Sequence, residues 1–359
     1  IADLVAAHVA ETEALAEQLK LKNRFIQETF GRYLSDAVVA GILESPDGLR
    51  LGGEKRTVTM LMSDLRGFSS IAERLAPEQV VRLINNYLGT MADVILAHDG
   101  TIDEFIGDSV LGFFGAPVAR GDDARRALVC ALAMQKGMEL VNLRNLDVGL
   151  PAVEMGIAVH TGEVVVGNIG SEKRAKYGAV GGHVNLTARI ESYTCGGQVL
   201  ISERTLRAAG PGIVTGGSLS VRAKGFPEPV RVHDLLGVEE SPDLHLARRP
   251  ETLWPVDPPL RAVFTVLEGK RVGRDEEPAE IVALSTRGAA FRSEAVLEPL
   301  SDLKIRIVGR GGLLPGDLYA KAVPVPDGPA GLTRLRFTSV PEELEPLLSR
   351  LGSGLDFLP

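Results

Sequence analysis

The order of strand and helix patterns between residues 57 and 238 constrains the fold more than any other feature. The segment TVTMLMSDL at 57–65 is an apolar run typical of a buried strand, and 77–100 reads as an amphipathic helix opened by Pro77. The elements predicted after these are hairpins over 101–115 and 153–170, helices over 122–141 and 183–194, a strand over 198–202 and two short strands within 219–237. We place the turn of the second hairpin at Thr161-Gly162. This order predicts an α+β domain with helices on one face of its sheet.

The chain outside this domain divides into two further parts. Residues 1–44 contain no proline and two glycines, and they are predicted to be helical. A weak heptad stripe runs along them through Val5, Val9, Thr12, Ala16, Leu19, Asn23, Ile26, Phe30 and Tyr33. Two interpretations stay open, a helix packed on its own domain or a parallel two-stranded signalling helix. Residues 245–359 carry short strand patterns that predict a small β-barrel, followed by a terminal helix over 341–352.

Composition excludes several classes of protein. A net charge of −8 disfavours a general nucleic-acid binder, which needs a basic surface. The 2 cysteines lack C-x-x-C partners, which predicts a reducing, cytoplasmic location. No apolar run approaches ~20 residues, so no membrane segment is expected. No signal peptide is found, and since the chain starts at Ile1, we expect it to be a fragment of a longer protein.

Two aspartates stand at predicted strand ends. Asp64 ends the strand 57–65, and Asp108 lies in the turn of TIDEFIGDSVLGFFG. If the two strands are neighbours, both carboxylates meet at one edge of the sheet. Hard oxygen donors with room for water and phosphate favour Mg²⁺ or Mn²⁺ over zinc. The alternative for each aspartate alone is a turn residue that caps backbone N–H groups.

Asn185 and Arg189 are spaced i, i+4 on the predicted helix 183–194, so they share one face. An amide and a guanidinium placed together can hold a ribose and an α-phosphate; an ordinary solvated pair is the alternative. No P-loop, G-x-S-x-G or H-E-x-x-H motif is present. His160 and His183 show no metal-ligand spacing and are predicted to be structural or solvent-facing.

Four stretches resemble a known family when they are taken in order. They are SDLRGFSSIAERL, EFIGDSVLGFFGAP, AVHTGEVVVGNIGSEKRAKYGAVGGHVNLTARIES and AKGFPEPVRVHDLLG. Together they resemble the catalytic domain of class III nucleotidyl cyclases over residues 45–238, which implies a ferredoxin-like α+β fold. The stretch RYLSDAVVAGILE also resembles the linker helix that joins such domains to upstream sensors.

The resemblance implies a role for each matching residue. Asp64 and Asp108 would bind two Mg²⁺ or Mn²⁺ ions per site with the Leu65 carbonyl, and Asn185 and Arg189 would stabilise the transition state. Lys224 would contact the triphosphate, and Arg174 or its neighbour Lys173 would touch phosphates. The implied reaction is attack of the substrate 3′-oxygen on the α-phosphate with release of pyrophosphate. Because the chain holds both halves of such a site, it is expected to form a head-to-tail homodimer with two shared sites.

Two positions indicate whether the nucleotide substrate carries adenine or guanine. Members that make cyclic AMP carry lysine where this chain has Glu104, and Asp or Thr where it has Gly182. A carboxylate can accept from guanine N1–H and the 2-amino group, which adenine does not offer. We therefore expect GTP as substrate and a guanylate cyclase; an adenylate or relaxed-specificity cyclase is the alternative. An inactive binding module is disfavoured, because both aspartates, Asn185 and Arg189 are present. Asp103 is expected to alternate away from Glu104 as a structural or solvated residue.

Three stretches lie within residues 245–359: RRPETLWPVDPPLRAVF, VALSTRGAAFRS and LRFTSVPEELEPLL. Together they resemble a PilZ domain. Arg249 matches the first arginine of the R-x-x-x-R motif, but Leu253 stands at the second. Ser285 and Gly288 match the strand motif, whereas Ala283 replaces its acid or amide. These losses predict weak or absent cyclic di-GMP binding unless arginines elsewhere compensate, the candidates being Arg248, Arg271 and Arg287. A degenerate barrel that contacts the cyclase domain or another protein is favoured.

Overall fold

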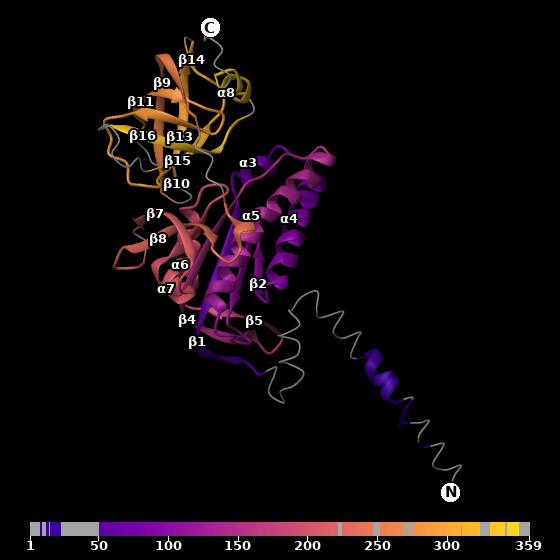
Figure 1. The fold of residues 1–359 in the computed structure, drawn as a ribbon. Coiled ribbons are helices and arrows are strands. Elements are labelled where there is room, and N and C mark those ends of the chain that lie inside the picture. The colour runs from indigo at the N-terminus through magenta and orange to yellow at the C-terminus, as the bar shows by residue number, and fades with distance from the viewer. Residues whose placement is uncertain are drawn as a thin grey trace.

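The computed structural model describes residues 8, 12–13, 15–22, 50–221, 225–246, 252–268, 271–272, 276–309, 311–323, 331–341 and 343–351 (Figure 1). They form two sheets, one built by residues 52–238 and the other a barrel that follows it. No helix in the described ranges is long and apolar enough to cross a membrane. Of the heptad stripe, only Thr12, Ala16 and Leu19 are described, on a helical stretch; the predicted signalling helix otherwise lies outside the described residues.

The first sheet is organised around two long strands. β1 (Gly52–Leu65) and β4 (Met155–Ser171) pair antiparallel over the whole of β1. The order is β2-β3-β1-β4-β6-β8-β7, and β5 pairs with β4 outside this path. The other strands are β2 (Thr101–Ile106), β3 (Ser109–Phe114), β5 (Arg174–Val180), β6 (Val199–Ser202), β7 (Ile213–Val221) and β8 (Val230–Val238). The predicted strand-turn-strand at 101–115 is confirmed as β2 and β3.

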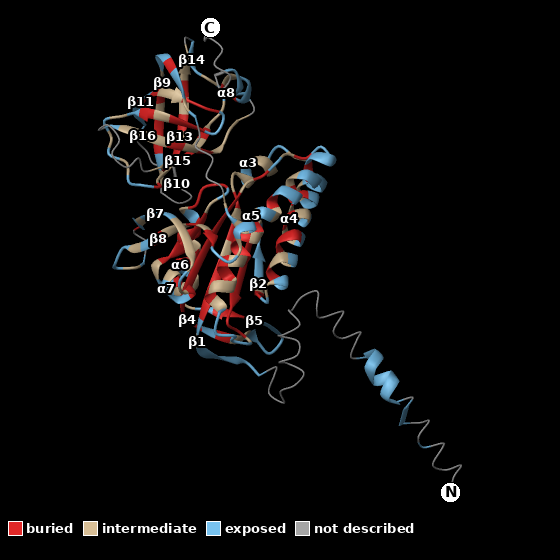
Figure 2. Ribbon diagram, in the orientation of Figure 1, coloured by how far each residue is buried: buried red, intermediate tan, exposed pale blue. Residues whose placement is uncertain are grey.

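Both faces of this sheet are covered, which corrects the expectation of helices on one face. Leu61 of β1 packs into the core formed with α4 (Pro77–Ala97) and α5 (Asp123–Asp147), which lie side by side in Figure 1. Its neighbour Met60 faces the opposite way, into a cluster with Val184 of α6 (Gly182–Ser192). Successive side chains of a strand point to opposite faces. Figure 2 accordingly shows the middle of the sheet buried, whereas the start of β1 is exposed.

The turn predicted at Thr161-Gly162 is wrong. β4 runs straight through these residues, and its hairpin partner β5 begins only at Arg174. Gly162 has another reason to be glycine, since an added Cβ would lie 2.3 Å from Cγ of His183. Helix α7 (Glu203–Ala209) was not predicted; Ser202 caps it by accepting a hydrogen bond from the Thr205 N–H.

The predicted barrel is confirmed. Six strands close in the order β9-β11-β12-β16-β15-β13, and pairing of β13 with β9 completes the ring. Its core includes Phe264 and Phe291, whose rings meet edge to face with centroids 5.3 Å apart. The ring strands are β9 (Trp254–Glu268), β11 (Glu277–Leu284), β12 (Gly288–Arg292), β13 (Asp302–Gly309), β15 (Leu318–Val323) and β16 (Leu332–Ser339); β15 was not predicted. Smaller elements are α3 (Phe68–Ala72), the 3-10 turn Pro242–Leu244, β10 (Arg271–Val272), β14 (Gly312–Leu313) and α8 (Glu345–Leu351).

Candidate functional site

The structure brings the two predicted aspartates together. Antiparallel pairing of β1 with β3 sets Ser63 opposite Val110, so the end of β1 lies beside the β2–β3 turn that holds Asp108. The Ser109 hydroxyl donates to Oδ1 of Asp64 at 2.5 Å. Burial raises the pKa of Asp108 to about 6, and the charge of Asp64 adds to this effect. A carboxyl group whose pKa is raised beside a second carboxylate belongs to an acidic site that favours a cation.

The donor set fits Mg²⁺ or Mn²⁺. Only oxygen atoms are offered, by Asp64, Asp108 and the Leu65 carbonyl, and among the described residues no group of three or more His, Cys, Asp or Glu is placed to hold a metal ion. Such a set suits an ion that takes one or two carboxylates and fills its remaining positions with water and substrate phosphate. It does not suit a closed structural zinc site.

An ion-pair chain that sequence reasoning missed links these acids to α6. The Arg66 guanidinium donates to Oδ2 of Asp64 at 3.1 Å and also pairs with Glu191 near the end of α6. Glu191 is buried, and burial raises its pKa to about 7, although Arg66 opposes the rise. The partners are 125 residues apart in the sequence, so local patterns carry no signal for this contact.

Helix α6 presents Asn185 and Arg189 to solvent, as their i, i+4 spacing predicts. Both side chains are exposed, while Leu186 and Ile190 on the other face are buried against the sheet. The two polar groups therefore lie on a surface that this chain leaves open, ready for a ligand or a second subunit.

A buried polar chain fixes the start of α6. His160 on β4 shares hydrogen bonds of 2.8 Å with Ser202 through Nδ1 and with Nδ1 of His183 through Nε2. Burial lowers the pKa of His160 to about 3, with the nearby His183 and Arg204 adding to the effect, so it is neutral near pH 7. The predicted structural role of the two histidines is thus supported by their contacts.

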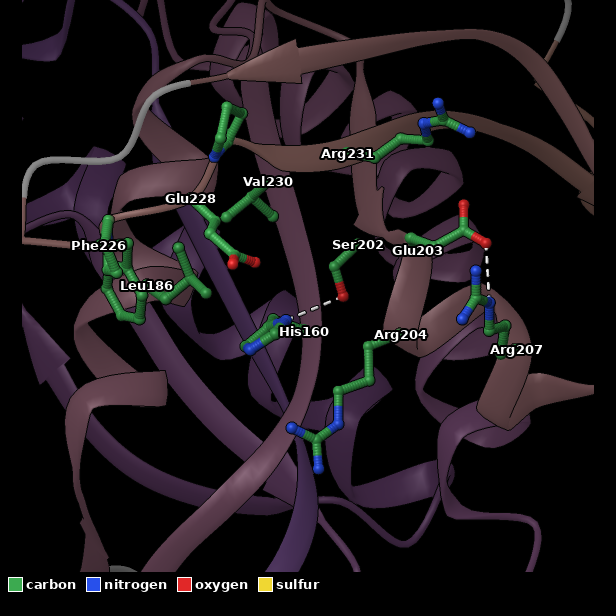
Figure 3. A pocket seen from close by; sticks show the side chains of 12 residues that line it. His160, Leu186, Ser202, Glu203, Arg204, Arg207, Phe226, Glu228, Val230 and Arg231 are labelled. Atoms are coloured by element: carbon green, nitrogen blue, oxygen red, sulfur yellow. Dashed lines mark hydrogen bonds and ion pairs between the residues drawn. The ribbon is translucent and has the colours of Figure 1, made fainter.

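A pocket of about 500 Å³ lies beside this chain (Figure 3). His160 points into it toward Ser202, and Leu186, Phe226, Arg204 and Arg207 are among the other lining residues. Neither Asp64 nor Asp108 lines it, and neither does Asn185 or Arg189. The residues of the candidate site thus lie outside this pocket.

Glu104 and Asp103 do not alternate as expected. A register shift lies between Ile102 and Glu104 on β2, and both carboxylates reach the same ammonium, Lys176 Nζ, at 2.8 Å. The Asp103 side chain is 1% exposed and accepts from the Ala179 N–H, whereas that of Glu104 is 44% exposed. Asp103 is thus structural rather than solvated, whereas the Glu104 carboxylate is partly exposed to solvent.

The remaining predicted residues are placed as follows. An added Cβ at Gly182 would meet only Phe226, at 3.9 Å, so the start of α6 has space at this position. Arg174 is exposed at the tip of the β4–β5 hairpin, where its N–H donates to Ser171. Lys224, and Arg248 and Arg249 of the PilZ-like motif, lie outside the described residues.

Comparisons with known proteins decide the family. The model of the adenylate and guanylate cyclase catalytic domain matches residues 53–229. The crystal structure of the guanylyl cyclase Cya2 is 55% identical and covers 55% of this chain and all of its own, with a TM-score of 0.54. That of the adenylyl cyclase CyaB from P. aeruginosa is 33% identical and covers 56% of this chain and all of its own, with a TM-score of 0.51. The chain belongs to the adenylate and guanylate cyclase family.

Two of the curated relatives are named adenylate cyclases. Adenylate cyclase 1 of Rhizobium meliloti is 32% identical over 236 residues, which is 65% of this chain and 35% of the relative. Adenylate cyclase of Anabaena cylindrica is 29% identical over 219 residues, 57% of this chain and 42% of the relative. The chain thus spans between a third and a half of the length of these two relatives.

In the barrel beyond the cyclase domain, two residues considered for cyclic di-GMP binding, Ser285 and Arg287, make other contacts. The Ser285 hydroxyl closes a local turn by accepting from the N–H groups of Arg287 and Gly288. The Arg287 side chain pairs with Glu154 of the cyclase domain at 2.9 Å. The side chain of Arg271 lies outside the described residues.

Gly162→Ala is expected to impair the cyclase domain by displacing α6. The new methyl would overlap Cβ and Cγ of His183, which lie close to the helix backbone and cannot swing away. Overpacking of this kind costs ~1–3 kcal/mol, and movement of Asn185 should lower kcat at least about tenfold. Denaturant unfolding and turnover assays measure both effects.

Gly89→Ala in α4 is the matched control, because nothing lies within 4 Å of its added Cβ. It should leave turnover unchanged and stabilise the helix by up to ~1 kcal/mol. If Gly162→Ala and Gly89→Ala had the same stability and the same kcat, the packing role of Gly162 would be contradicted.

Proposed function

We propose that the chain is a guanylate cyclase that converts GTP to 3′,5′-cyclic GMP and pyrophosphate. The observation that carries the proposal is the pair Glu104 and Gly182. Glu104 offers a carboxylate whose orientation Lys176 fixes, and Gly182 leaves space without a second acceptor. Guanine presents two donors, N1–H and the 2-amino group, to one carboxylate, while its O6 is free of repulsion at position 182.

The identities to the solved structures weigh in the same direction. Cya2, which is titled a guanylyl cyclase, shares 55% identity, compared with 33% for the adenylyl cyclase CyaB. The second candidate, an adenylate cyclase, is favoured by the names of the curated relatives at 32% and 29% identity. An adenine site would leave Glu104 facing a ring-nitrogen lone pair, which a desolvated site penalises strongly.

The domain assignment forms part of the proposal. We assign residues 1–44 to a signalling helix, 45–238 to the cyclase domain and 245–359 to a PilZ-like barrel. The two free, buried cysteines, Cys130 and Cys195, agree with a reducing compartment such as the cytoplasm.

The active form is proposed to be a head-to-tail homodimer. In one chain the Asn185 and Arg189 side chains are exposed and the two aspartates are partly exposed, and the pocket of about 500 Å³ includes none of them. A two-fold partner would bring the acids of one subunit to α6 of the other and so close two equivalent sites.

Asp64, Asp108 and the Leu65 carbonyl would hold up to two Mg²⁺ or Mn²⁺ ions. Bound there, divalent ions would lower the cost of alkoxide formation and of charge on the leaving pyrophosphate. Asn185 would orient the ribose, and Arg189 would donate to the α-phosphate oxygens as negative charge accumulates. Arg174 and Lys224 would contact the triphosphate. Much of the catalysis would come from positioning and electrostatics.

The direct test is the cyclic product formed from GTP and from ATP with Mg²⁺ or Mn²⁺. We expect kcat/KM for GTP to exceed that for ATP by at least about 10²-fold. A preference for ATP would favour the adenylate cyclase, and no product from either nucleotide would favour an inactive module.

A further inference from the structure

A buried lysine of the C-terminal barrel contacts the cyclase domain. Lys321 on β15 is 1% exposed, and its ammonium donates to the Ser192 carbonyl at 2.8 Å and to Oδ1 of Asp302 at 2.6 Å. Ser192 is the last residue of α6. The final carbonyls of a helix have no partner within it, and a cation there also complements the helix dipole. The barrel therefore supplies the C-terminal cap of this helix.

A leucine of the barrel packs beneath the same helix. Leu300 is 6% exposed and belongs to the apolar cluster that includes Leu186 and Ile190 of α6. Its φ of 64° lies in the left-handed region, which is costly for a side chain with a Cβ. Burial of the side chain, worth roughly 1.5–3 kcal/mol, can offset that cost. This strained residue thus serves the contact between the two domains.

Further contacts hold the segments that flank both halves of the candidate site. Arg336 donates to the Gly196 carbonyl at 2.8 Å, just after α6. Gly67 follows the strand of Asp64 with φ 67°, and an added Cβ there would lie 2.5 Å from the Thr338 carbonyl oxygen of the barrel. The barrel thus meets the cyclase domain at the end of α6 and at the loop after the metal-site aspartate.

We propose that the barrel is a structural part of the catalytic unit, with Lys321 as a positioning residue for α6. The end of the helix is held on one side by the Arg66–Glu191 pair and on the other by Lys321. Arg189 lies three residues before Ser192, so fraying of this turn would move the guanidinium that meets the α-phosphate. The effect on turnover rests on the proposed function, whereas the effect on α6 does not.

The test compares Lys321→Met with Arg292→Met in the full chain. Arg292 is a matched control, since its side chain is 62% exposed and pairs with Glu280, a residue of the same barrel, rather than with the cyclase domain. In Lys321→Met, hydrogen exchange of the amides at 189–195 should rise about tenfold or more, in line with loss of a charge-assisted hydrogen bond. With the preferred nucleotide, kcat should fall about tenfold while KM changes less than threefold. Lys321→Arg should restore part of kcat.

Leu300→Ala weakens the same contact between barrel and α6 without removing a charged group. If Lys321→Met fails to fold, this variant tests whether the barrel positions α6. It should loosen α6 in the same exchange assay, while Arg292→Met leaves both exchange and kcat unchanged. Unchanged exchange at 189–195 in the folded variants would overturn the positioning role. Absence of turnover in the unaltered protein would instead count against the proposed function, and the exchange result would still test the contact.

Discussion

Asp64→Ala should abolish cyclic-nucleotide formation, with kcat lowered by at least about 10³-fold. The variant removes one of two carboxylates offered to the divalent ion and leaves Asp108 as the only acidic ligand. Folding should survive, because the side chain is 29% exposed and Arg66 keeps its second partner, Glu191. Product formation from GTP, followed alongside thermal unfolding, measures both consequences.

Asp147→Ala is the control for removal of a carboxylate, since Asp147 is exposed at the end of α5. It should retain full turnover. If Asp64→Ala kept a tenth or more of the original kcat at any Mg²⁺ or Mn²⁺ concentration, the metal role of this residue would be wrong.

Exchange of the base-reading pair should invert nucleotide preference. In Glu104→Lys/Gly182→Asp, a lysine donates to an adenine ring nitrogen and the new carboxylate accepts from the amino group of adenine. We expect the ratio of kcat/KM for GTP over ATP to fall by about 10³-fold or more, because a mismatched base leaves buried polar groups unpaired. Gly182 has room for the new side chain, with only Phe226 at 3.9 Å from its added Cβ.

The structure adds one condition to this experiment. A lysine at position 104 would lie beside Lys176, whose ammonium already bridges Asp103 and Glu104. The double variant is therefore also made with Lys176→Met, which removes repulsion between the two cations. Glu163→Lys is the control for charge reversal on an exposed strand position and should leave the ratio unchanged. A ratio that stays constant in all of these variants would exclude Glu104 as the base reader.

Local patterns predicted much of the sheet and its acids. The apolar run before Asp64 and the strand-turn-strand around Asp108 gave β1, β2 and β3, and their pairing brought the carboxylates together as expected. The alternation of side chains along a strand was a less reliable guide to side-chain direction. Because of the register shift on β2, Asp103 and Glu104 both pair with Lys176. At Gly162, a residue typical of turns was needed for close packing instead.

The sequence by itself therefore determined the strand and turn that carry Asp64 and Asp108 and the shared exposed face of Asn185 and Arg189. These features depend on strand period, helix period and turn chemistry, which act over a few residues. Only the tertiary structure decided that Arg66 reaches Glu191 and that Lys321 caps α6 from 129 residues away. Such contacts depend on where whole elements pack, and a buried charge is tolerated only where packing supplies its partner.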